Sequence, residues 1–177
     1  MMGRILAVGS VALDTVETPF GTAREALGGS ATFFSAAARF FSPVSVVAVV
    51  GKDFPKKHLA LLEKLGVDTR GIQVETGRTF RWHGRYSFDL NNPKTLKTEL
   101  NVFQDFRPKI APEQQHSRFV FLANIDPDLQ RSVLRQVRCP ELVACDTMNF
   151  WIQTKKKELD LKYAKEVQDR EKIMTSE

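Results

Sequence analysis

Three groups of residues have the types and positions needed to hold a hydroxylated ligand. Asp14 follows a short apolar run, and a carboxylate can accept hydrogen bonds from two hydroxyl groups of a polyol. Gly28-Gly29-Ser30 precedes a stretch rich in alanine and phenylalanine; glycines before a helix let a ligand approach the N–H groups at its positive end. Asn124 follows another apolar run, where open α/β sheets bind their ligands.

Each of these groups also has a purely structural explanation. An aspartate such as Asp14 is common in turns. Gly28-Gly29 is also typical of a plain junction between a loop and a helix. Asp126, close to Asn124, precedes Pro127 and is equally suited to cap a helix N-terminus.

The elements that must position these residues alternate between strands and helices. Continuous apolar runs predict buried strands over 4–12, 44–50, 119–123 and 142–145. Helical composition and turn signals predict helices over 28–41, 56–65 and 127–137, and another from about Phe150. This alternation predicts a parallel sheet covered by helices.

The middle of the sequence has a different pattern. Large and polar side chains alternate over 79–88, a turn follows at Asn91-Asn92-Pro93, and a partner strand is expected over 95–100. A further extended stretch, from Asp14 to Phe20, ends at a turn signal. These segments predict a small, half-exposed antiparallel unit beside the parallel sheet.

Composition excludes several classes of function. The net charge of +5 is spread along the chain and no basic stripe carries interleaved aromatics, so nucleic acid is not an expected partner. Two cysteines and three histidines without ligand spacing predict reduced thiols and no metal site. The sequence also lacks an apolar run of membrane-spanning length, so we expect no membrane partner and a cytoplasmic location.

The order of several motifs resembles the ribokinase (PfkB) superfamily of small-molecule kinases. Gly9-Ser10 is followed by Asp14, then Gly28-Gly29 at a helix start, then Val-Gly-Lys-Asp-Phe ending at Phe54. Leu-Gly-Val-Asp-Thr-Arg-Gly-Ile ending at Ile72 fits the same pattern, as does Asp-Thr-Met-Asn-Phe-Trp ending at Trp151. The resemblance extends from about Arg4 to about Lys157. A nucleotide-binding domain of another class is disfavoured, because neither phosphate-loop glycine pattern occurs.

The resemblance implies an α/β fold: a ribokinase-like three-layer sandwich with a parallel central sheet and a small antiparallel β lid. The lid strands are expected at about 12–22 and 78–101. Residues 1–158 are expected to form the N-terminal part of this domain, ending after about four parallel strands and leaving an open sheet edge. Residues 159–177 are expected to be a charged tail, either a frayed helix or disordered.

The resemblance also implies ATP-dependent phosphorylation of a sugar or nucleoside hydroxyl, with Mg²⁺ as a cofactor of the complete family member. The implied substrate-binding residues are Asp14, Gly28, Gly29, Ser30 and Asn124. A homodimer through the lid is expected as a further partner interaction.

Two departures from the family pattern change the expected function. The family's helix usually has a substrate-contacting asparagine where this chain has Phe33, so a partly apolar acceptor or a different sugar pose becomes an alternative to ribose or fructose. The Gly-Ala-Gly-Asp loop that supplies the anion hole and the catalytic base is absent, since Gly84 is the last glycine.

The missing loop leaves no catalytic residue to assign and no bound nucleotide or metal to expect. Losing a general base typically costs about 10²–10⁴ in rate. We therefore expect the acceptor-binding half of a kinase, inactive alone. The alternative is a catalytically dead module of the same fold that binds a ligand or dimerises.

Overall fold

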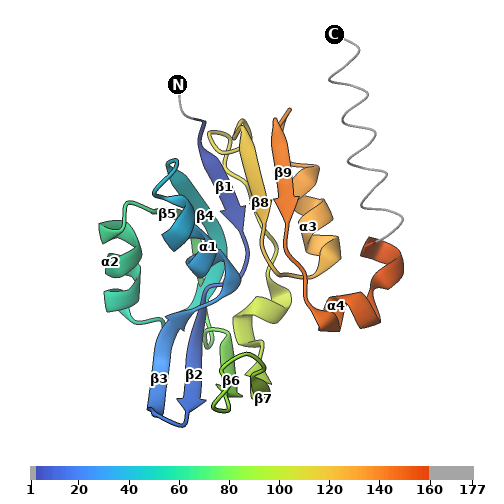
Figure 1. Ribbon diagram of the computed structural model, residues 1–177. Helices are drawn as coiled ribbons and strands as arrows, with labels where there is room; N and C mark the ends of the chain where they lie inside the picture. The colour runs from blue at the N-terminus through green and yellow to red at the C-terminus, as the bar shows by residue number, and fades with distance from the viewer. Residues whose placement is uncertain (1–2, 160–177) are drawn as a thin grey trace.

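The central sheet has five parallel strands in the order β5–β4–β1–β8–β9 (Figure 1). The computed structural model describes residues 3–159. The strands are β1 (Ile5–Val8), β4 (Val44–Gly51), β5 (Asp68–Glu75), β8 (Phe119–Leu122) and β9 (Leu142–Cys145). Every residue of β4 is buried, as its unbroken run of apolar and small residues predicts for a central parallel strand.

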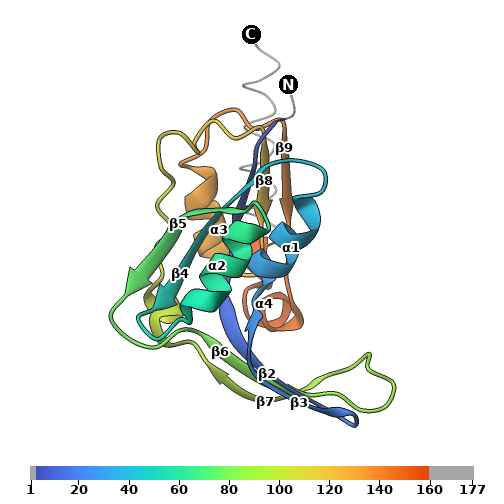
Figure 2. The ribbon, with the colours of Figure 1, turned by 90° about the vertical axis from the view of Figure 1, so that its left-hand side faces the viewer.

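Helices cover both faces of this sheet and complete a three-layer sandwich (Figures 1 and 2). The helices are α1 (Ser30–Ala38), α2 (Lys56–Lys64), α3 (Pro127–Leu134), α4 (Asn149–Thr154) and the 3₁₀ helix η1 (Asn101–Asp105). Residues of α1 and α2 pack with Ala7, Val46 and Ala48. Residues of α3 pack on the other face of the sheet, since successive side chains of a strand point to opposite faces.

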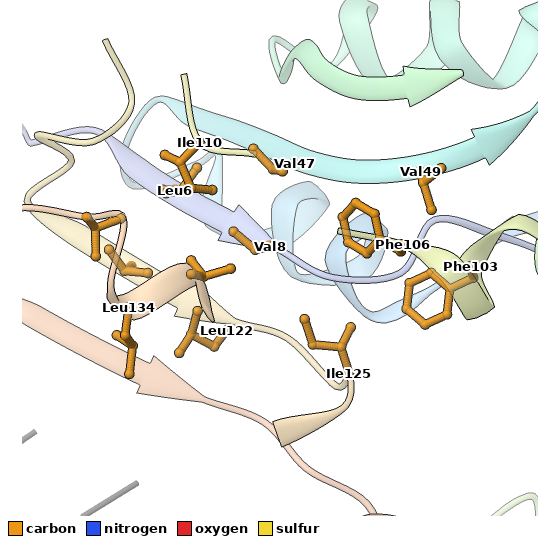
Figure 3. Close-up of a cluster of buried hydrophobic side chains, with 13 residues drawn as sticks. Leu6, Val8, Val47, Val49, Phe103, Phe106, Ile110, Leu122, Ile125 and Leu134 are labelled. Carbon is orange, nitrogen blue, oxygen red and sulfur yellow. The ribbon is translucent and has the colours of Figure 1, made fainter. Parts of the chain in front are cut away.

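The larger core cluster fills the face under α3 (Figure 3). Leu6 and Val8 of β1 lie beside Val47 and Val49 of β4, and phenylalanines from η1 and the loop after it cover them (Figure 3). Phe103 stacks on Phe106 with a ring-centroid distance of 5.7 Å. The segment that follows the lid is thereby anchored to the central sheet.

The lid is a second sheet of four strands in the order β3–β2–β6–β7. Its strands are β2 (Ala12–Thr18), β3 (Gly21–Gly28), β6 (Arg81–Arg85) and β7 (Lys94–Glu99). The predicted antiparallel lid is correct for β2–β3 and β6–β7 but wrong for the central pair, because β2 and β6 run parallel. The lid lies at the carboxyl end of β1 (Figure 1).

Three other features differ from the sequence prediction. The single strand predicted over 4–12 is two strands in two sheets, because the chain turns between β1 and β2. Strand β3 was not predicted; it is mostly exposed and carries alanine and charged residues, which are depleted in strands. Strand β5 was also missed. It contains Gly71, where a Cβ would lie 2.5 Å from the Val46 carbonyl oxygen.

Strand β9 forms one edge of the five-stranded sheet, as the predicted open edge requires. The side chain of Leu142 on this strand is 59% exposed. The charged tail was predicted over 159–177, and all of it except Leu159 lies outside the described residues. The tail and the domain boundary at residue 158 therefore remain predictions. Over residues 3–159, no helix has the length and apolar character needed to cross a membrane.

Candidate substrate site

Asp14 lies at the base of the lid, where β2 leaves the central sheet. The preceding residue is fixed by a 2.9 Å hydrogen bond from the Leu13 amide to the Phe80 carbonyl oxygen. The Asp14 carboxylate is half-buried against the end of β3 and accepts a hydrogen bond from the Gly29 backbone amide. The structure therefore brings together Asp14 and the two glycines predicted from the sequence.

Gly28 leaves the space that the Asp14 carboxylate occupies, and Gly29 leaves the space that the Ser10 backbone occupies. A Cβ at Gly28 would lie 2.0 Å from Oδ2 of Asp14, which is well inside van der Waals contact. Gly29 has φ +99° and ψ 147°, a region that is essentially restricted to glycine. A Cβ at Gly29 would also meet the Ser10 carbonyl oxygen at 2.3 Å. Both positions thus require glycine for the site to keep this shape.

Ser10 supplies the cap that α1 lacks in its own sequence. Gly29, at the N-cap position, has no side chain. Instead, the Ser10 hydroxyl accepts a hydrogen bond from the Ser30 amide at 3.0 Å and lies 3.1 Å from the Ser30 hydroxyl. The Ser10 carbonyl oxygen accepts a hydrogen bond from the Ala31 amide at 3.1 Å. A residue twenty positions away therefore orients the first turn of the helix.

Replacing Ser10 by alanine is expected to destabilise the protein by about 1 kcal/mol, the usual cost of removing a helix cap. The Ser30 amide would lose its partner, and the first turn of α1 would no longer be fixed against Asp14. Urea unfolding monitored by circular dichroism measures the change. Ser10→Thr keeps the hydroxyl and is the matched control; equal stability of all three proteins would contradict the capping role.

Asn124 joins the site from the adjacent strand end. A Cβ on Gly9 would lie 2.4 Å from the Cβ of Ala123 and 3.3 Å from the Ser30 hydroxyl oxygen, so the ends of β1, β8 and α1 converge at this glycine. Asn124 follows Ala123 directly, and its buried Oδ1 has no hydrogen-bond partner among the described residues. This atom is an unpaired acceptor just past the carboxyl end of β8.

The sequence allowed two roles for Asp126, a ligand contact or a helix cap. In the structure it caps α3. Its carboxylate accepts a 2.9 Å hydrogen bond from the Asp128 amide at the start of α3. Both carboxylate oxygens also lie 2.8 Å from Nζ of Lys155, which pairs with Asp128 as well. These contacts tie the segment after β9 to α3.

Burial sets the protonation of Asp14. Burial raises the pKa of this carboxyl to about 6, and the hydrogen bond from Gly29 opposes the shift without cancelling it. The charged form is disfavoured because the low-dielectric surroundings replace water. Near neutral pH the group is largely an ionised carboxylate that is incompletely solvated. Hydroxyl groups of a ligand would supply the hydrogen bonds that water cannot provide there.

Phe33, at the position expected from the resemblance to hold an asparagine, and its neighbour Phe34 lie in different surroundings. Phe34 packs toward the sheet and stacks on Phe121, with ring centroids 3.7 Å apart. Phe33 points the other way and is 62% exposed. The sequence pattern included Ser10 only as part of the Gly9-Ser10 motif, without a role at the site, and it did not connect Trp82 with the site.

Several proteins of known structure or function resemble this chain. No protein-family model matches it. A cytidine kinase from Thermococcus kodakarensis is 27% identical over 136 residues, which is 76% of this chain and 48% of that enzyme. The chain thus spans about half the length of this curated relative.

Two solved nucleoside kinases have the same arrangement of elements. The Methanocaldococcus jannaschii nucleoside kinase, an archaeal member of the ribokinase family, superposes with a TM-score of 0.67 at 19% identity, covering 89% of this chain and 56% of that one. The Burkholderia thailandensis nucleoside kinase in complex with inosine gives 0.64 at 16% identity, covering 75% and 46%. The same kinase is also solved with ADP-inosine. The present chain therefore has the ribokinase fold, over about half the length of the kinases that share it.

Proposed function

We propose that this chain forms the acceptor-substrate part of a ribokinase-family kinase that phosphorylates a hydroxyl group of a sugar or nucleoside. One observation carries the proposal: the half-buried Asp14 carboxylate is held against Gly28 and Gly29 at the start of α1. A carboxylate that can accept hydrogen bonds from two ligand hydroxyls is suited to a vicinal diol.

The remaining residues of the site have supporting roles in this proposal. Ser30 presents its hydroxyl at the helix terminus, where Ser10 fixes it. Asn124 offers the unused Oδ1 acceptor to a ligand hydroxyl. The lid, rooted at Asp14, covers the acceptor and excludes water from the reacting hydroxyl.

ATP and Mg²⁺ act in the proposed reaction only in the complete kinase. ATP supplies the γ-phosphoryl group, and Mg²⁺ neutralises charge on the phosphates. The residues of this chain do not fit that half of the reaction, because the glycine-rich anion hole and its aspartate base do not occur in the sequence. The 177 residues alone are therefore proposed to bind the acceptor without phosphorylating it.

A homodimer through the lid is proposed as a second role of the same fold. Phe20 and Phe88, at the far end of the lid, are 78% and 80% exposed and touch each other edge to face. Exposed aromatic pairs of this kind favour association. Sedimentation of the wild type and Phe20→Ser at several concentrations tests this role.

Thermal unfolding with and without ligands tests the proposed function. Cytidine, inosine or D-ribose at about a hundred times its Kd is expected to stabilise the protein by about 2.7 kcal/mol. MgATP is expected to leave the Tm unchanged. If none of the three acceptors raises the Tm, acceptor binding by this chain is refuted; a rise with MgATP alone would relocate the function to nucleotide binding.

A further inference from the structure

Trp82 lies on the same face of the lid as Asp14. Strands β2 and β6 are parallel, and Asp14 is directly beside Trp82 in their register. Residues paired in this way on neighbouring strands place their side chains on one face of the sheet. Strand β6 lies between β2 and β7 (Figure 1), so Trp82 occupies the middle of the face that begins at Asp14.

The opposite face of the lid is polar and already paired. His83 lies 2.8 Å from a Glu17 carboxylate oxygen, and Arg85 donates to the other oxygen at 2.7 Å. These residues belong to the alternate register, beginning with the pair Leu13 and Arg81. The two faces therefore differ in kind: one carries the charge pairs, and the other carries the carboxylate and the indole.

The indole lies flat along the lid. A Cβ on Gly84 would lie 2.0 Å from Cη2 and 2.3 Å from Cζ2 of Trp82, so the ring occupies the space that a side chain at position 84 would fill. The indole Nε1 donates a 3.2 Å hydrogen bond to the Thr95 hydroxyl on β7. Gly84 is buried beneath the ring, while Trp82 itself is only half-buried. One side of the ring packs on the Gly84 backbone, so the exposed part of the indole faces away from Gly84.

We propose that Trp82 determines acceptor specificity: its open face stacks on the base of a nucleoside while Asp14 holds the ribose hydroxyls. The inference rests on the proposed function and adds the substrate class. An aromatic face beside a diol-binding carboxylate matches a flat base joined to a ribose, and a free sugar lacks the flat part. Base stacking on an aromatic side chain is tolerant of base identity, so pyrimidine and purine nucleosides both bind.

Calorimetric titration of the purified full chain with cytidine, inosine and D-ribose tests the role of Trp82. The wild type is expected to bind a nucleoside more tightly than ribose. Trp82→Leu is expected to lose about 5- to 150-fold in nucleoside affinity and to bind ribose as before. Trp82→Phe keeps a ring face and retains most of the affinity. Gly84→Ala, which displaces the indole without removing it, reproduces the selective loss.

His83→Leu is the matched control, because it removes a ring from the next residue, on the other lid face. It is expected to leave nucleoside affinity unchanged. A second readout is independent of affinity: in Trp151→Phe, Trp82 is the sole tryptophan, and stacking quenches its fluorescence with nucleosides but not with ribose.

The outcomes separate the two proposals. Equal nucleoside affinity of Trp82→Leu and the wild type, with no quenching, overturns the role of Trp82 and leaves acceptor binding intact. An equal loss for ribose and nucleosides in a folded Trp82→Leu also overturns it, since the residue then supports the lid only. A wild type that binds none of the three ligands refutes the proposed function itself, and with it the inference.

Discussion

Asp14→Asn is expected to melt at a higher temperature than the wild type at pH 7 and to bind the acceptor far more weakly. The pKa of Asp14 is raised from 3.8 to about 6 by burial, so between these values the folded state holds a proton that the unfolded state has released. The wild type therefore loses stability as the pH rises from about 4 through about 6. The neutral amide escapes this loss.

Thermal unfolding of both proteins between about pH 3.5 and about pH 7.5 measures the effect. We expect the variant to exceed the wild type by about 2–4 °C above pH 7, which corresponds to about 1 kcal/mol in a domain of this size, and the difference to vanish below pH 4. Glu17→Gln is the control of opposite sign, because hydrogen bonds from Arg85 and His83 lower the pKa of Glu17. A lower Tm for Asp14→Asn at pH 7 would contradict the assignment.

Binding should change in the other direction. Hydrogen bonds to a charged group contribute about 1.5–3 kcal/mol, so Asp14→Asn should weaken acceptor binding by about 10- to 150-fold. Wild-type affinity should also increase as the pH rises through about 6, since the carboxylate is the better acceptor. A side chain whose replacement stabilises the fold but weakens binding serves function at the expense of stability.

Gly29→Ala is expected to have the largest effect on stability, about 3 kcal/mol or more. The new methyl group would be forced into a backbone region reserved for glycine and would meet the Ser10 carbonyl oxygen at 2.3 Å. Relief of that collision requires α1 to move away from the end of β1, which breaks the cap and the contact with Asp14. Urea unfolding measures the loss.

Gly66→Ala separates the collision from the backbone strain. Gly66 also has a positive φ, +78°, but a Cβ there meets no atom within 4 Å. We expect Gly66→Ala to cost about 1 kcal/mol, the usual penalty for a strained backbone angle. Similar losses for the two variants would show that the close approach to Ser10 contributes nothing.

The sequence predicted the parts of the fold whose signals are local. Buried strands such as β4 form largely apolar runs. The start of α3 is marked in the sequence by a capping residue, Asp126, followed by Pro127. The edge strands β3 and β5 carry no such signal, although the edge strand β9 does. Strand β5 has Gly71 in its interior, and β3 is solvated along most of its length, so neither strand was predicted.

The candidate site was predictable where residue type alone constrains the chemistry. Asp14 and the glycine pair were identified because few other residue types can do what they do. A carboxylate is needed to accept two hydroxyl hydrogen bonds, and glycine is needed for a ligand to approach the backbone at a helix start. Ser10 and Trp82 were not, because their roles depend on a hydrogen bond across twenty residues and on the pairing of β2 with β6. The parallel pairing of these strands could not be read from the alternation of either one.

The edge strand β9 has a consequence for handling the protein in solution. No strand pairs with its outer side among residues 3–159, and Leu142 is largely exposed on it. Unpaired backbone N–H and C=O groups on an edge strand can pair with a strand of another molecule, and a neighbouring apolar side chain favours that contact. Strand β9 is therefore one surface for self-association at high concentration, and Leu142→Lys is expected to oppose it by placing a charge on this edge.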